Sequence, residues 1–187
     1  MVGQHHGDIQ TTSLLQQQLE AELQAREARL AEVQSTYDEL VGKLEQEIER
    51  GEVRISELKG KLTVNVVDKI LFDSGKAELK SAGVKVLQQI GDILNSAVDK
   101  NIQVEGHTDN VPISGSLTTK YPSNWELSTA RAGAATRYLI DRGVPASRIR
   151  AVGYADTRPL VPNSSRESRA KNRRVEFLFV RDAQERT

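Results

Sequence analysis

The chain has 187 residues, which is enough for one ordinary domain and an extension, and it contains no cysteine, which excludes disulfides and thiolate metal sites. Its 26 basic and 26 acidic residues balance, but residues 1–62 carry 7 basic and 12 acidic side chains (net −5) and residues 63–187 carry 19 and 14 (net +5). The basic residues are scattered among few aromatic side chains, so no nucleic-acid partner is expected, and an anionic polymer suits the charge distribution better.

The amino-terminal region contains no membrane signal. No stretch approaches the ~18 consecutive apolar residues of a membrane-spanning helix, and no apolar core of a signal peptide is present. Residues 1–13 are interpreted as disordered or as sequence added to the natural chain. We therefore expect the natural amino terminus, and a membrane anchor with it, to lie outside this sequence.

Residues 14–62 predict a long stalk helix, because they are rich in Gln, Glu, Ala, Leu and Arg and contain no proline. Apolar residues recur at spacings of three and four, the pattern of a coiled-coil seam. The seam comprises Leu19, Leu23, Leu30, Val33, Tyr37, Leu40 and Leu44. Three glycines inside the segment each cost about 1 kcal/mol in a helix interior, which disfavours an isolated helix. We expect self-association into a dimer, and the alternative is one amphipathic helix folded back on its own domain.

Residues 63–187 predict a single α+β domain. Alternating apolar residues indicate strands over 61–72, 102–106, 149–153 and 175–179, and helical spacing indicates a helix over 78–97. A long loop over 110–123 leads into a second helix, which begins at a Ser123-x-x-Glu126 capping box and stops at Gly143. The β-α-β-α-β-β order predicts a two-layer sandwich around one core.

A carboxylate and a guanidinium are expected to meet at one crevice. Asp109 follows the strand that ends at Gly106, and Arg131 lies early in the following helix. Together they could hold a ligand end that carries both an ammonium and a carboxylate. An Asx-turn is the structural alternative for Asp109.

Three residues of the second helix share one face, because Asn124, Leu127 and Arg131 are spaced by three and four positions. The planar fork of Arg131 fits a bidentate carboxylate. A surface salt bridge to Glu126 or Glu105, contributing about 0–1 kcal/mol, is the alternative reading.

Catalysis and metal binding have little support in the sequence. His107 is the single histidine of the domain, no Gly-x-Ser-x-Gly elbow is present, and the carboxylates are scattered. We interpret His107 as a packed residue that positions the loop. Trp125 could stack on a sugar or anchor the loop, and the second reading is favoured.

Five motifs together resemble the OmpA/MotB C-terminal domain. They are Phe72-Asp73-Ser74-Gly75-Lys76-Ala77-Glu78-Leu79, Gly106-His107-Thr108-Asp109-Asn110, the helix start from Asn124 to Ala132, Gly153-Tyr154, and Asn172-Arg173-Arg174-Val175-Glu176. Within the loop, the insert Asn110-Val111-Pro112-Ile113 and the segment that begins at Tyr121-Pro122 resemble the MotB-like branch of this family. The resemblance implies an OmpA-like α/β sandwich that binds peptidoglycan non-covalently through the diaminopimelate of the stem peptide.

The resemblance also implies the site residues. It assigns peptidoglycan contacts to Thr108, Asp109, Asn124, Leu127, Arg131 and Arg173. Adjacent strand residues point to opposite faces, so only one of Arg173 and Arg174 can enter the pocket, and the family motif favours Arg173.

The predicted function is that of a wall anchor, not an enzyme, and it requires no cofactor. We expect a periplasmic protein tethered to the inner or outer membrane. The alternative is a periplasmic oligomeric scaffold in which the coiled coil dominates and wall binding is weak.

Overall fold

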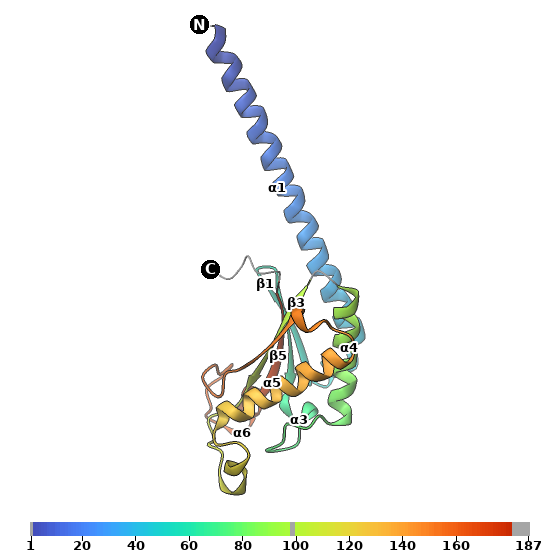
Figure 1. Cartoon of the computed structure of the whole chain (residues 1–187), viewed down its shortest axis with the longest axis vertical. Helices are drawn as coiled ribbons and strands as arrows, with labels where there is room; N and C mark the ends of the chain where they lie inside the picture. Colours follow the sequence, from blue (N-terminus) through green and yellow to red (C-terminus); the bar gives the residue numbers. More distant parts are fainter. Residues whose placement is uncertain (1, 98–99, 181–187) are drawn as a thin grey trace. The chain divides into compact units, whose positions relative to one another are not determined.

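The computed structural model describes residues 2–97 and 100–180, and the side chains from Thr12 onward within these ranges. The chain divides into two compact units, one ending at Ser35 and the other beginning at Thr36. The first is helical throughout its described residues, because helix α1 runs Val2–Lys43 and continues into the second unit (Figure 1). The backbone of residues 2–13 is helical, so the expectation of disorder is wrong there. No proline interrupts this segment, and a helix propagates easily once nucleated.

The predicted stalk helix over 14–62 ends early. After α1 comes the short helix α2 (Glu45–Glu49), and then strands β1 (Val53–Leu58) and β2 (Lys61–Val67) form an antiparallel hairpin. Lys59 and Gly60 join the strands, both with positive φ, as a type I′ turn requires. Gly51 also has positive φ. Two of the glycines interpreted as helix interior thus occupy turns, and the domain boundary at residue 63 is too late.

One five-stranded sheet has the order β1-β2-β5-β3-β4. Strands β3 (Asn101–His107) and β4 (Ile149–Gly153) are parallel, and β5 (Arg174–Val180) runs antiparallel to both β2 and β3. Helices α4 (Ser81–Ser96) and α5 (Asn124–Asp141) form the second layer over this sheet (Figure 1). The α+β fold and the β-α-β-α-β-β order are confirmed, with β1 added in front.

The hydrophobic core lies between the sheet and the two helices, and it takes in the end of α1. Leu40 and Leu44 are fully buried, and Gln89 of α4 donates a hydrogen bond of 2.8 Å to the carbonyl of Lys43. In contrast, Leu19, Leu23 and Leu30 are 50–57% exposed. The predicted seam therefore divides: its last residues pack inside their own domain, and its first residues remain at the surface of α1.

Short elements complete the fold. Helix α3 (Asp68–Leu71) replaces the last third of the strand predicted over 61–72, because the chain turns where the Asp68 N–H donates to the carbonyl of Arg173. The other short helices are η1 (Gly115–Thr119), η2 (Ala146–Arg148) and α6 (Arg166–Asn172). Within residues 2–97 and 100–180, no helix combines the length and the apolar character that a membrane span needs.

Candidate functional site

The site forms where β3 ends beneath the start of α5. A Cβ added to Gly106 would lie 2.1 Å from the carbonyl oxygen of Ser128, so only glycine allows the strand and the helix to approach this closely. The predicted capping box is present: the Ser123 hydroxyl accepts from the backbone of α5, and Glu126 accepts from the Ser123 N–H at 2.8 Å. Local sequence thus sets where α5 begins relative to Asp109.

Asp109 combines the two roles that its sequence position allows. Its Oδ1 accepts a hydrogen bond of 2.9 Å from the Val111 N–H, which is the Asx-turn. Its Oδ2 accepts from Nη1 of Arg173 at 2.5 Å. The Asp109 side chain is 9% exposed and that of Arg173 is 36% exposed, so the pair meets solvent on the arginine side.

Arg131 is held in a buried ion pair. Its Nη1 lies 2.9 Å from Oδ1 of Asp68, and its Nε donates to the carbonyl of Lys76 at 2.9 Å. Nη2 donates to the carbonyl of Asp73 at 3.3 Å, and the guanidinium covers the Phe72 ring at 5.1 Å. The Arg131 side chain is only 4% exposed. The alternative reading of a surface salt bridge to Glu126 or Glu105 is therefore wrong in both partner and burial.

Sequence reasoning missed Asp68. It lies far from Arg131 along the chain, at the point where β2 gives way to α3, and only the fold brings the two together. The available signal was an acidic residue directly after the alternating valines of β2. Asp68 also ties the two aspartate–arginine pairs together, because its N–H donates to the carbonyl of Arg173 at 3.0 Å.

The four charged side chains influence one another. Burial raises the pKa of the Asp68 carboxyl above its ordinary value, although Arg131 and Arg173 act to lower it. Burial likewise lowers the pKa of the Arg131 guanidinium, against the attraction of Asp68. Two carboxylates and two guanidiniums therefore form one compact cluster, which we call the charged quartet: Asp68, Asp109, Arg131 and Arg173.

The remaining predicted residues support the loop after β3. Thr108 is buried, and its hydroxyl donates to the carbonyl of Asp109. Asn124 donates to the carbonyls of Asp109 at 3.3 Å and Val111 at 3.0 Å. Leu127 is buried on the same helix. These hydrogen bonds place Thr108 and Asn124 beside Asp109 of the quartet.

Arg174 lies on the other side of the sheet from Arg173. It is buried, and its Nε donates to Glu176 at 2.6 Å while its Nη1 donates to the carbonyl of Asn172 at 3.0 Å. The structure therefore brings Arg173, and not Arg174, to Asp109.

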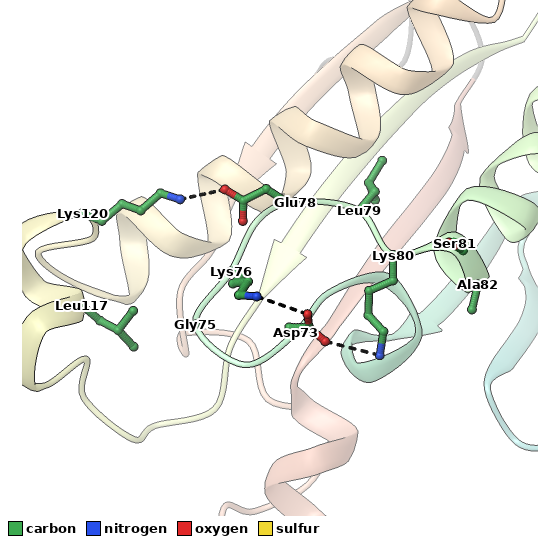
Figure 2. A pocket seen from close by; sticks show the side chains of 10 residues that line it. All are labelled: Asp73, Gly75, Lys76, Glu78, Leu79, Lys80, Ser81, Ala82, Leu117 and Lys120. Atoms are coloured by element: carbon green, nitrogen blue, oxygen red, sulfur yellow. Dashed lines mark hydrogen bonds and ion pairs between the residues drawn. The ribbon is translucent and has the colours of Figure 1, made fainter.

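A cavity of 760 Å³ adjoins the loop that Arg131 holds. Figure 2 shows Lys76 and Lys80 directed at Asp73, and Lys120 directed at Glu78. The cavity is lined by Asp73, Gly75, Lys76, Glu78, Leu79, Lys80, Ser81, Ala82, Leu117 and Lys120. The quartet does not line this cavity, but Arg131 bonds the carbonyls of two of its wall residues.

A second cavity, of 510 Å³, shares part of that wall. It is lined by Ala77, Glu78, Leu79, Lys120, Tyr121, Ala130, Ala134, Arg137, Tyr138 and Asp141. The two cavities meet at Glu78, Leu79 and Lys120. Together they make an extended hollowed surface that is lined by both charged and apolar side chains.

The fold and the site define the class of this domain: a two-layer α+β sandwich with paired opposite charges at the end of its central strand. The chain belongs to the OmpA family, whose family model matches residues 71–173, more than half of its length. The match covers β3, α5 and β4, and it ends at Arg173.

Curated relatives agree with this family. An uncharacterized protein of Bacillus subtilis, YtxE, is 44% identical over 59% of this chain and 44% of its own length. Motility protein B of the same organism is 38% identical over 64% of this chain and 45% of its own length. The peptidoglycan-binding protein ArfA of Mycobacterium bovis is 35% identical over 58% of this chain and 31% of its own length. The chain thus matches less than half of the length of these relatives.

Solved structures share the fold. A MotB-like protein from Desulfovibrio vulgaris superposes with a TM-score of 0.77 at 29% identity, over 87% of this chain and 99% of the other. The cell wall anchor of the type VI secretion system of Pseudomonas aeruginosa superposes with a TM-score of 0.69 at 34% identity, over 76% of this chain and 97% of the other. The predicted MotB-like character is therefore confirmed.

Proposed function

We propose that this chain binds peptidoglycan non-covalently and anchors its parent protein to the cell wall. The observation that carries the proposal is the Asp109–Arg173 pair, in which opposite charges meet at a half-open edge of an OmpA-family site. Two relatives support it by their names, since ArfA is described as peptidoglycan-binding and the Pseudomonas structure as a cell wall anchor.

The finer proposal is that the bound group is diaminopimelate of the stem peptide. Its free end carries an ammonium and a carboxylate, and such an end can replace one protein ion pair with two protein–ligand pairs. Asp109 then accepts from the ammonium, and the half-exposed fork of Arg173 takes the carboxylate.

Arg131 contributes from below in this proposal. Its guanidinium is 4% exposed and bonded to Asp68, Lys76 and Asp73, so it supports the wall of the site without contacting the ligand. Thr108 and Asn124 hold the backbone at Asp109, and Leu127 is buried one turn before Arg131 on α5. The cavity of Figure 2 accommodates the neighbouring part of the polymer.

Co-sedimentation with purified walls tests this function. We expect the full chain to pellet with diaminopimelate-type peptidoglycan, and to pellet much less with lysine-type peptidoglycan, because lysine lacks the terminal carboxylate. The absence of released muropeptides separates binding from hydrolysis. Equal recovery on both walls would refute the selectivity, and no recovery on either would refute the function.

Self-association of α1 is a second part of the proposal. Leu19, Leu23 and Leu30 lie on one seam and are at least half exposed, which favours a partner helix. Sedimentation should show a dimer, and the Leu23→Glu, Leu30→Glu variant should be a monomer. If the dimeric wild-type chain bound no wall, the scaffold function would be the better reading.

The cellular location follows from this function. A protein that anchors to peptidoglycan works on the periplasmic side of the membrane, and we propose that its parent protein is tethered there by a segment outside this sequence. Fractionation of cells that express the natural gene should place the protein with the envelope. Recovery in the cytosol would contradict the proposal.

A further inference from the structure

The sheet face turned away from the helices carries a second charged cluster. Gly106 faces α5, so its neighbours Glu105 and His107 point to the opposite face of β3. The register of β5 places Glu176 directly across from Glu105. The sequence predicts no metal site because its carboxylates are scattered, yet strand pairing brings these three side chains together.

His107 is the unexplained member of this cluster. It is 3% exposed, and within the described part of the chain neither ring nitrogen has a hydrogen-bond partner. Its ring stacks on Tyr154 with centroids 5.4 Å apart, which fixes its plane. Nε2 only approaches Oε2 of Glu105 at 3.4 Å, and a buried imidazole without hydrogen bonds is costly unless a proton or a metal ion links it to its neighbours.

Each carboxylate of the cluster has one oxygen held and one oxygen available. Gln103 donates to Oε1 of Glu105 at 2.6 Å, and Arg174 donates to Oε1 of Glu176 at 2.6 Å. Metal-binding carboxylates are oriented in the same way by outer hydrogen bonds. Oε2 of Glu105 then faces Nε2 of His107 at 3.4 Å, and Glu176 contributes a carboxylate oxygen within 4.8 Å of the other two ligand atoms.

The distances suit a small divalent ion. One ligand atom from each of Glu105, His107 and Glu176 lies within 4.8 Å of the others. Nε2 of His107 is 3.4 Å from Oε2 of Glu105, and two ligands at about 2.05 Å from a tetrahedral zinc ion lie about 3.3 Å apart.

The charge balance favours a cation at this point. Glu105 and Glu176 supply two negative charges, and Arg174 supplies one buried positive charge. Arg158 approaches from the covering loop, where it stacks on Tyr154 at 3.7 Å. With His107 neutral, the buried set keeps a net negative charge, and the 15% exposure of the Glu176 side chain offers a route of entry.

We propose that Glu105, His107 and Glu176 form a binding site for a divalent zinc-class ion. Three protein ligands leave the fourth tetrahedral position to water. The ion would link β3 to β5 and hold the base of the loop after β4, independently of the wall-binding quartet.

Calorimetric titration of the full chain with Zn²⁺ tests the site, with Co²⁺ as a spectroscopic probe. His5 and His6 offer a competing site, so all proteins carry His5→Ala and His6→Ala. We expect one Zn²⁺ per chain, a rise in Tm with added Zn²⁺, and visible absorption bands of tetrahedral Co²⁺.

Glu176→Gln preserves the shape and removes the charge, so it should weaken Zn²⁺ binding about 100-fold or more. Asp92→Asn, an exposed carboxylate on α4, is the matched control and should change nothing. His107→Gln should abolish the Co²⁺ bands. No Zn²⁺ binding by the parent protein, or equal binding by the parent and Glu176→Gln, would overturn the proposal.

Discussion

Two aspartate–arginine pairs lie side by side in this domain and differ chiefly in burial. In the Asp68–Arg131 pair the side chains are 12% and 4% exposed, and the guanidinium also bonds two carbonyls and covers Phe72. In the Asp109–Arg173 pair the arginine is 36% exposed. The same chemistry thus serves the fold in one pair and remains accessible to a ligand in the other.

This difference in burial shows that Arg131, although it belongs to the family motif, does not face solvent, whereas Arg173 does. A buried pair that loses one partner leaves an uncompensated charge, whereas an exposed arginine that loses its partner is rehydrated. Substitutions in the two pairs should therefore separate loss of stability from loss of binding.

The largest effect is expected from Arg131→Ala. It strands the Asp68 carboxylate in a buried position, which costs about 3–5 kcal/mol of unfolding free energy. Urea unfolding followed by circular dichroism measures this. Arg173→Ala is the matched comparison and should cost less, about 1 kcal/mol, because removal of the 36%-exposed arginine lets water solvate the Asp109 carboxylate. Similar losses in both variants would show that the two pairs do not differ in role.

A smaller loss is expected from Asp68→Asn. The amide oxygen can still accept from Arg131, so only the charge is removed, and the cost should be about 1–3 kcal/mol. The same urea experiment ranks this variant between Arg173→Ala and Arg131→Ala. A loss as large as that of Arg131→Ala would mean that the charge of Asp68, and not its hydrogen bond, holds the guanidinium.

The smallest effect is expected from Glu126→Gln, in the capping box at the start of α5. The hydrogen bonds from Ser123 lower the pKa of the Glu126 carboxyl below its ordinary value of 4.5. Its stabilising contribution is therefore present above pH 4.5 and is lost as the pH falls through the lower folded value. Glu126→Gln should lower Tm slightly at pH 7 and not at strongly acidic pH. A Tm difference that grows on acidification would contradict the capping role.

Local features of the fold were predictable from the sequence, and long-range ones were not. The start of α5 follows from Ser123 and Glu126, which interact across a single turn. Strand β1 was misread as helix because Ile55 and Leu58 continue the helical spacing of the segment before them, although the chain has already turned at Gly51. Leu40 and Leu44 continue the seam spacing, but the same spacing also fits packing on α4.

The candidate site shows the same limit. Asp109 was predictable because it closes an apolar strand, and Arg131 because it lies on the following helix. The partner of each depended on the fold: α3 brings Asp68 to Arg131, and the end of α6 brings Arg173 to Asp109. Pairings between distant segments require the sheet order, which the sequence pattern does not specify.

Titration calorimetry with a diaminopimelate-containing muropeptide tests the central claim most directly. Wild-type protein should bind, and Asp109→Ala and Arg173→Ala should each lose about 2–5 kcal/mol of binding free energy, because each leaves one ligand charge unpaired. Both variants should keep their Tm within a few degrees. Arg150→Ala, a matched change of an exposed arginine on β4 that lines neither cavity, should bind like wild type. Wild-type affinity in Asp109→Ala or Arg173→Ala, with an unchanged Tm, would contradict the proposed binding site.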